Sequence, residues 1–258
     1  MDIKLAKETA IKAIREAGDI LMLGLYKEKK VSFKGRGDIV THVDLESEKF
    51  ILDLIRKNFP DHSILSEESG FTDKESEYIW VLDPIDGTMN YYHGFDTFCI
   101  GLCLLKNDEL VISAIYNPVR DQFYFAQKGK GATLNGEIIK VSNMSMENSI
   151  IATHLSSKKD KRDRIIYKLE KICSAGMHIR MLGSSLSAIT HIASGSLDAF
   201  FSVDKTNPWD ILPGALFVQE AGGKVTDIKG NKIGINSSSV LATNGKLHEK
   251  ILSLLKDI

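Results

Sequence analysis

The chain carries an apolar run directly into a turn that holds two carboxylates. Residues 80–90 read Trp-Val-Leu-Asp-Pro-Ile-Asp-Gly-Thr-Met-Asn. Pro84 fixes its own φ and restricts Asp83 to an extended backbone, so Asp83 and Asp86 are held in a stiff turn at the edge of a sheet. Gly87 permits a sharp turn, and Thr88 then begins a helical turn whose N–H groups can bind a phosphate. Carboxylate oxygens beside such an anion site suit Mg²⁺ together with a phosphate ester.

The same turn could simply end a strand, because Asp, Pro and Gly are common turn residues. Two further acidic segments favour a metal site instead. Glu67 and Glu68 follow the apolar pair at residues 64–65, and Asp210 opens an otherwise apolar helix. Alone, the glutamates could be a solvated loop pair, and Asp210 could complement a helix dipole. If the three segments converge, their carboxylates stay ionised at neutral pH only when cations accompany them.

Two helices and a largely antiparallel sheet are expected in the first half. Apolar residues at three- and four-residue spacing predict a helix over residues 3–23, and a second helix buries Phe50, Ile51, Leu54 and Ile55 before Pro60 ends it. Residues 27–38, which include Lys-Gly-Arg-Gly-Asp, are expected to form a mobile loop. Short apolar runs predict strands at residues 78–82, 98–105 and 110–116. The pair Asn135 and Gly136 predicts a tight hairpin turn.

After about residue 150 the pattern alternates between strands and helices, which predicts an α/β layer. The expected strands cover residues 150–153, 178–181, 199–201 and 240–243, and the expected helices cover residues 160–173, 184–193, 209–221 and 247–255. The sequence has neither an internal repeat nor a Gly/Ser/Pro-rich linker. We therefore expect one unit over residues 1–258, with subdomains 1–145 and 146–258.

Charge and cysteine usage exclude several classes of protein. The 33 Lys and Arg residues balance 34 Asp and Glu residues, without the basic excess of a general nucleic-acid binder. Cys99, Cys103 and Cys173 lack the spacing of a zinc site and are odd in number, which argues against a disulfide framework. Uninterrupted apolar runs stay well below the roughly 18 residues of a membrane span. We expect a cytoplasmic protein with neither nucleic acid nor membrane as its partner.

Four motifs occur in order along almost the whole chain. They are Asp-Ile-Val-Thr-His-Val-Asp at residues 38–44, Ile-Leu-Ser-Glu-Glu at 64–68, Leu-Asp-Pro-Ile-Asp-Gly-Thr-Met-Asn at 82–90, and Trp-Asp at 209–210 with Glu-Ala-Gly-Gly at 220–223. Together they resemble the inositol monophosphatase family of Mg²⁺-dependent, lithium-sensitive phosphatases. The resemblance implies an α/β fold, an αβαβα layered sandwich of the inositol monophosphatase and fructose-1,6-bisphosphatase type. It also implies an active site between the two halves, and a homodimer.

The resemblance assigns metal ligands and catalytic residues. It implies a first Mg²⁺ on Glu67, Asp83 and the carbonyl of Ile85, a second on Asp83, Asp86 and Asp210, and a third, looser Mg²⁺ near Glu67. Thr88, hydrogen-bonded to Asp44, would orient the attacking water together with Glu67. The N–H groups of Gly87 and Thr88 would bind the phosphate. No serine or histidine nucleophile is then needed.

The resemblance implies a small phosphorylated polyol or sugar as substrate, with inositol 1-phosphate as the first expectation. Residues 200–208 are one residue longer than the family segment whose Glu hydrogen-bonds inositol, and Ser202 or Asp204 falls near that position. Ser185 is the expected contact from the segment around residue 184. Ile85, Asp86 and Asp210 are expected to border the substrate as well as the metals. Fructose 1,6-bisphosphate, histidinol phosphate and 3′-phosphoadenosine phosphates stay open as substrates, as does a non-catalytic regulatory role.

Overall fold

The computed structural model describes residues 2–35, 38–155, 159–203 and 206–256. Its helices are α1 (Ile3–Leu25), α2 (His42–Asn58), α3 (Thr88–His93), α4 (Lys159–Ser174), α5 (Ser185–Ala193), α6 (Pro208–Glu220) and α7 (His248–Leu255). Its first strands are β1 (Val31–Gly35), β2 (Asp38–Thr41), β3 (Ser63–Ser66), β4 (Gly70–Thr72), β5 (Tyr78–Asp86), β6 (Cys99–Lys106), β7 (Glu109–Asn117) and β8 (Gln122–Gln127). The remaining strands are β9 (Ala132–Leu134), β10 (Glu137–Ile138), β11 (Ile150–Thr153), β12 (His178–Arg180), β13 (Ala199–Ser202), β14 (Lys224–Thr226) and β15 (Val240–Thr243).

Two sheets form the framework of the molecule. The larger has the strand order β10-β9-β8-β7-β6-β5-β3-β4, and the smaller has the order β12-β11-β13-β15-β14. In the larger sheet only β3 and β5 run parallel; its other neighbours are antiparallel. In the smaller sheet β11 is parallel to β12 and β13, whereas β15 is antiparallel to β13 and β14.

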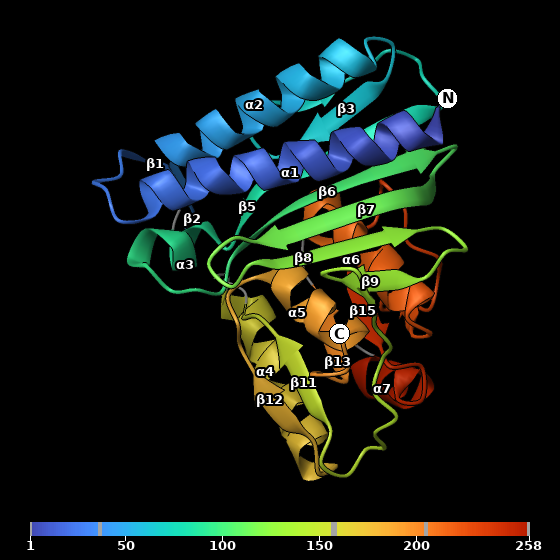
Figure 1. Cartoon of the computed structure of the whole chain (residues 1–258). Coiled ribbons are helices and arrows are strands. Elements are labelled where there is room, and N and C mark those ends of the chain that lie inside the picture. The colour runs from blue at the N-terminus through green and yellow to red at the C-terminus, as the bar shows by residue number, and fades with distance from the viewer. Residues whose placement is uncertain (1, 36–37, 156–158, 204–205, 257–258) are drawn as a thin grey trace.

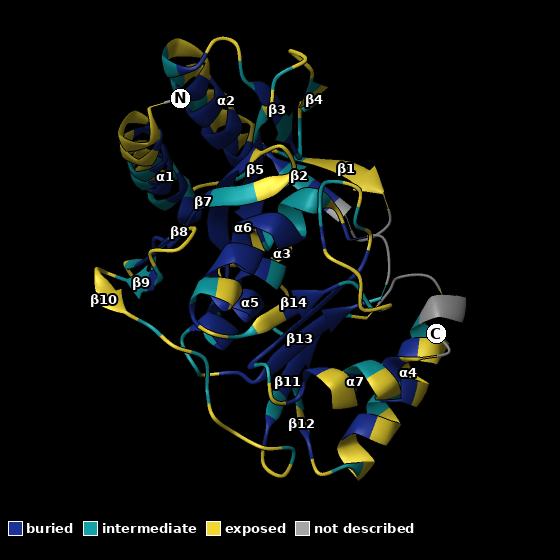
Figure 2. Cartoon of the chain, turned by 90° about the vertical axis from the view of Figure 1, so that its right-hand side faces the viewer, coloured by how far each residue is buried: buried dark blue, intermediate teal, exposed yellow. Residues whose placement is uncertain are grey.

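Helices cover both sheets, which gives the order αβαβα (Figure 1). Helices α1 and α2 pack on one face of the larger sheet, and α5 and α6 fill the space between the sheets. Helices α4 and α7 cover the far face of the smaller sheet. The central strands are therefore buried on both faces: Trp80 and Leu82 point toward α1 and α2, whereas Val81 points toward α5 and α6. Figure 2 shows this buried interior, with exposed residues on the outer faces of the covering helices, on the loops and on the edge strands β1 and β10.

The layered fold, the long helices and the antiparallel first sheet agree with the sequence analysis. The hairpin at Asn135 and Gly136 is confirmed, and both residues have positive φ, 49° and 89°. The expected boundary near residue 145 stays a prediction; the larger sheet ends at Ile138 and the smaller begins at Ile150. In the part of the chain that the structure describes, no helix is long and apolar enough to cross a bilayer.

The expectation of a loop over residues 27–38 is wrong for residues 31–35 and 38, which are strand; residues 36–37 lie outside the described residues. Strands β1 and β2 pair antiparallel there, with Val31 opposite Thr41 and Phe33 opposite Ile39. Most of β1 is exposed, so its residues lack the apolar alternation that marks a half-buried strand. Pairing with β2 stabilises this segment instead, and Gly35 is the last residue of β1, opposite Asp38.

Candidate metal and phosphate site

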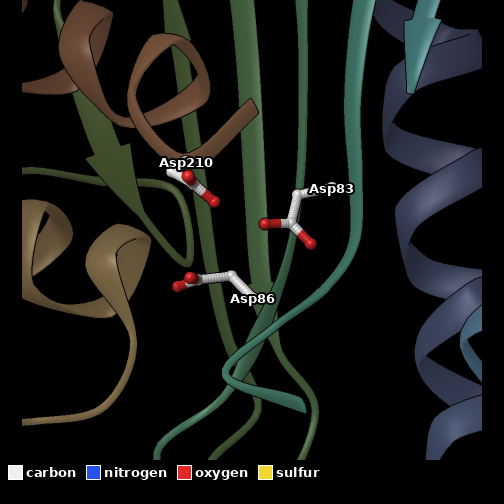
Figure 3. A group of neighbouring side chains, drawn as sticks. All are labelled: Asp83, Asp86 and Asp210. Atoms are coloured by element: carbon white, nitrogen blue, oxygen red, sulfur yellow. The ribbon is translucent and has the colours of Figure 1, made fainter. Parts of the chain in front are cut away.

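Three aspartates from two elements meet between the sheets. Asp83 and Asp86 end strand β5, and Asp210 lies in the first turn of α6. Each offers a carboxylate oxygen within 4.8 Å of the others (Figure 3). Asp83 and Asp86 are buried, whereas Asp210 is partly exposed. The structure thus brings together three of the residues that the sequence analysis expected to bind metal.

Backbone N–H groups hold two of these carboxylates at helix ends. Asp86 accepts hydrogen bonds from the N–H groups of Leu186 (2.8 Å) and Ser185 (3.1 Å) at the start of α5, and from the Ser184 hydroxyl. Asp210 accepts a 2.8 Å bond from the N–H of Asn207, the residue that caps α6. The positive end of each helix favours an anion, so these carboxylates are fixed before any ligand binds.

The local charge is unbalanced. Burial raises the pKa of Asp83 well above its usual range, and the neighbouring charges of Glu67, Asp86 and Asp210 raise it further. Burial and the charge of Asp86 raise the pKa of Asp210 to about 8. Clustered carboxylates of this kind repel one another unless protons or cations accompany them. An all-oxygen, anionic donor set suits a hard cation such as Mg²⁺, so these residues fit the expected metal.

Glu67 lies at the edge of the cluster and already contacts a cation. Strand β3 runs parallel to β5, so the turn after Ser66 brings Glu67 next to the end of β5. Lys34 of β1 places its Nζ 3.0 Å from Glu67 and 2.5 Å from Glu68. Burial raises the pKa of Glu67, and Lys34 opposes that shift. Burial alone would lower the pKa of Lys34, but its bonds to Glu68 and Glu67 outweigh this and raise it.

Asp44 and Thr88 form the hydrogen bond that the resemblance implies. The Thr88 hydroxyl oxygen lies 3.1 Å from Asp44 Oδ1 and 2.9 Å from the carbonyl oxygen of Ile85, either of which can accept its proton. The other oxygen of Asp44 accepts from the N–H (2.8 Å) and hydroxyl (2.6 Å) of Thr41. Burial raises the pKa of Asp44 to about 6.

Gly87 makes the turn between β5 and α3 possible. Its φ is +92°, and a Cβ there would lie 3.1 Å from the Thr97 carbonyl oxygen and 3.2 Å from that of Gly183. Both conditions favour glycine. Because α3 begins at Thr88, the N–H groups of its first turn have no acceptor within the helix and can bind an anion.

The substrate segment differs in part from expectation. Ser185 lines a cavity of about 150 Å³ beside Asp86, as expected of a substrate contact. Ser202 lies next to this cavity rather than on its wall: it is 1% exposed, and its hydroxyl lies 3.0 Å from Nε2 of His154. Asp204 lies outside the described residues.

Two further residues of the site, Lys34 and Glu48, escaped the sequence analysis, and so did the contact between Ser184 and Asp86. Lys34 was assigned to a loop, although Phe33 and Ile39 on either side of a glycine pair could have indicated a hairpin. Glu48 of α2 accepts a 2.9 Å bond from the N–H of Glu68 and another bond from the Ser69 hydroxyl. Its spacing of four residues from Asp44 was a usable signal, because such residues share a helix face. Ser184 has no comparable signal, since its contact with Asp86 spans 98 residues.

Comparisons with known proteins point the same way as the geometry. The sequence model of the inositol monophosphatase family matches residues 3–258. Inositol monophosphatase 2 of Solanum lycopersicum is 34% identical over 97% of both chains, and the fructose-1,6-bisphosphatase/inositol-1-monophosphatase of Thermotoga maritima is 36% identical over 96% of this chain and 95% of that one. The crystal structure of the extragenic suppressor protein SuhB from Bartonella henselae superposes with a TM-score of 0.92 at 29% identity, over 98% of each chain.

Proposed function

The chain belongs to the inositol monophosphatase family, and we propose that it catalyses the Mg²⁺-dependent hydrolysis of a small phosphomonoester. Membership makes it a phosphoric monoester hydrolase. The observation that carries the proposal is the convergence of Asp83, Asp86 and Asp210, whose oxygens lie within 4.8 Å of one another. These groups have raised pKa values, so a divalent cation would relieve a real electrostatic cost.

The proposed metal ligands are those of the resemblance. Two to three Mg²⁺ ions would be held, one by Glu67, Asp83 and the carbonyl of Ile85, one by Asp83, Asp86 and Asp210, and a looser one near Glu67. Bound there, Mg²⁺ supplies positive charge that acidifies a water molecule and stabilises the phosphoryl and leaving oxygens.

Residues of the chain orient the reactants. In this proposal the Thr88 hydroxyl donates its hydrogen bond to Asp44 rather than to the Ile85 carbonyl, so its lone pairs can accept a hydrogen bond from the attacking water. Glu67 fixes the same water from the other side. The N–H groups of Gly87 and Thr88 hold the phosphoryl oxygens. The water oxygen bonds to phosphorus as the bond to the alcohol oxygen breaks, and neither serine nor histidine forms an intermediate.

Inositol 1-phosphate is the proposed substrate, with fructose 1,6-bisphosphate as second candidate because the Thermotoga relative is named for both activities. Phosphate release from inositol 1-phosphate, fructose 1,6-bisphosphate, histidinol phosphate and 3′-phosphoadenosine 5′-phosphate is measured with Mg²⁺ and with EDTA. We expect release only with Mg²⁺, and fastest from inositol 1-phosphate. If the protein releases phosphate from none of the four substrates, the non-catalytic regulatory role is favoured instead.

We also propose that Li⁺ inhibits the protein. A small monovalent ion can take the place of the second Mg²⁺ without supplying its charge, so the leaving oxygen loses stabilisation. Titration of Li⁺ at fixed Mg²⁺ should lower phosphate release, with Na⁺ as the matched control. Equal rates in the two salts would contradict this expectation.

We propose as well that the protein is a cytoplasmic homodimer. Light scattering measures the oligomeric state.

A further inference from the structure

The side chain of Asn90 joins two segments that lie far apart in the sequence. Asn90 lies on α3, and its Nδ2 donates a 2.6 Å hydrogen bond to the carbonyl of Thr97 and a 2.8 Å bond to the carbonyl of Leu182. Because both partners are carbonyl oxygens, only the amide nitrogen can face them, and each of its two hydrogens has an acceptor. Thr97 leads into β6 of the larger sheet, whereas Leu182 leads into α5. One amide therefore joins α3 and the larger sheet to the start of α5.

The backbone around this amide is closely packed. Gly183 has a φ of +72°, and a Cβ at this position would lie 2.9 Å from the Asn90 amide. A Cβ at Gly87 would lie 3.1 Å from the Thr97 carbonyl oxygen and 3.2 Å from that of Gly183. The same two segments thus approach α3 at its first turn and at Asn90. Contacts this close leave the segments little room to shift while the amide bonds hold.

The segment that Asn90 holds also carries the donors that fix Asp86. Three groups of residues 184–186, the Ser184 hydroxyl and two backbone N–H groups, donate to the Asp86 carboxylate. Ser184 is two positions after Leu182, so the carbonyl that Asn90 binds and the donors to Asp86 belong to one short stretch of backbone. A shift of this stretch would move or release the Asp86 carboxylate.

We propose that Asn90 is a positioning residue of the active site: by tying residues 182–184 to Thr97, it holds Asp86 in the place that the second Mg²⁺ requires. This inference rests on the proposed phosphatase function and adds to it a residue that acts through Asp86. A primary amide on a short side chain suits this task, because it supplies two N–H groups from one atom. Aspartate has the same shape but no N–H group to donate.

The test uses two variants of Asn90 and one matched control. Asn90→Ala removes both bonds, and Asn90→Asp keeps the side-chain volume but has no N–H group. Asn244→Ala is the control, because the Asn244 amide also donates to two acceptors, the Ser142 hydroxyl and the carbonyl of Met144, and is 4% exposed. Asn244 lies between β15 and α7, so its bonds serve another part of the fold. Urea unfolding in EDTA establishes that each variant folds.

Three readouts are measured on the full chain. Hydrogen–deuterium exchange in EDTA reports how often the backbone of residues 184–188 opens. The Mg²⁺-dependent rise in unfolding temperature, without substrate, reports Mg²⁺ affinity. Phosphate release, from whichever of the four proposed substrates is hydrolysed fastest, gives kcat and KM.

We expect both Asn90 variants to speed exchange over residues 184–188 about tenfold, with β15 unchanged, and to raise the half-saturating Mg²⁺ concentration about tenfold. At saturating Mg²⁺, kcat should fall about tenfold, whereas KM should stay within about twofold of the wild-type value. Asn244→Ala should lower stability but leave these quantities at their wild-type values.

Wild-type exchange and Mg²⁺ affinity in both Asn90 variants, or equal changes in Asn244→Ala, would overturn this proposal while the phosphatase function stands. Faster exchange without a change in Mg²⁺ affinity or kcat would show that Asn90 only stabilises the fold, and would overturn it as well. If the wild-type protein releases phosphate from none of the substrates, the proposed function fails, but exchange and Mg²⁺ affinity still decide whether Asn90 positions Asp86.

Discussion

Single residues of the acidic cluster lower the stability of the metal-free fold, but they provide the carboxylates that the proposed metal site needs. Asp83 is 1% exposed and has three acidic neighbours whose charges raise its pKa. Its hydrogen bond from the N–H of Ile85 (3.1 Å) fixes the side chain but does not neutralise it. A bound cation would make such a group favourable, so Asp83 would be the central ligand of the proposed site.

The variant Asp83→Asn separates the effect of this carboxylate on stability from its effect on phosphate release. We expect phosphate release to fall by about a thousandfold or more, because the amide cannot supply the charge that both proposed Mg²⁺ ions share. The metal-free variant should be at least as stable as the wild type, since one repelling charge is gone. Phosphate release and urea unfolding in EDTA measure the two outcomes. Asp61→Asn, at an exposed position, is the control, and unchanged activity of Asp83→Asn would refute the metal assignment.

Helix α2 acts as an element that organises the site from one side. Asp44, Ser47 and Glu48 are buried at spacings of three and four, so they share one face. They bond in turn to the Thr88 hydroxyl, the carbonyl of Pro84 (3.3 Å) and the N–H of Glu68 (2.9 Å). Three separate segments of the site are therefore aligned by the first two turns of one helix.

Glu48→Ala tests this positioning role. Loss of the bonds to the N–H of Glu68 and the hydroxyl of Ser69 should release the turn that carries Glu67. We expect about tenfold weaker activation by Mg²⁺, as is typical when a residue behind a metal ligand is removed. Glu48→Gln, which keeps a hydrogen-bond acceptor, should recover most of the activation by Mg²⁺. The Mg²⁺ dependence of phosphate release distinguishes this from a general loss of stability, which would leave the half-maximal Mg²⁺ concentration unchanged.

The short helix α3 depends on the glycines at its two ends. Gly87 and Gly94 both have positive φ, +92° and +78°, but a Cβ at Gly87 meets backbone oxygens at 3.1 and 3.2 Å, whereas nothing lies within 4 Å of one at Gly94. Gly87→Ala should lower the free energy of unfolding by about 2–3 kcal/mol and abolish phosphate release, and Gly94→Ala should cost only about 1 kcal/mol. Chemical denaturation of the pair measures the difference. Equal stability of the two variants would show that the close contacts at Gly87 relax.

Local sequence determines most of the elements but fewer of the contacts that complete the site. Periodicity predicted α1, α2 and the central strands because each buries a regular face, and the acidic motifs predicted the residues of the carboxylate cluster. Strand β1 was missed because its residues are exposed and gain stability only from β2. The contact between Ser184 and Asp86 was missed for a related reason, because the two residues lie 98 positions apart in the sequence. Such contacts depend on the packing of whole layers, which no local pattern encodes.

At the scale of the whole molecule, the site joins the two sheets. Asp83 and Asp86 come from the larger sheet, whereas Asp210 and the N–H groups that bind Asp86 come from α5 and α6, which pack against both sheets. Folding therefore forces the carboxylates together, and the core that brings them together must overcome their repulsion. A bound cation would relieve that cost, so the proposed metal binding would be coupled to global stability.

This coupling predicts how stability depends on pH. The pKa of Asp210 is raised to about 8 and that of Asp44 to about 6, so the metal-free folded state binds more protons than the unfolded state from about pH 4 to pH 8. Its free energy of unfolding should therefore fall as pH rises through this window, by about 2–3 kcal/mol between pH 6 and pH 8. With saturating Mg²⁺ the trend should reverse, because the ions replace the protons and bind more tightly as the carboxylates ionise. Urea unfolding across this range, in EDTA and in Mg²⁺, measures both slopes. Asp210→Asn should flatten the EDTA slope, and parallel slopes with and without Mg²⁺ would contradict a cation site at these carboxylates.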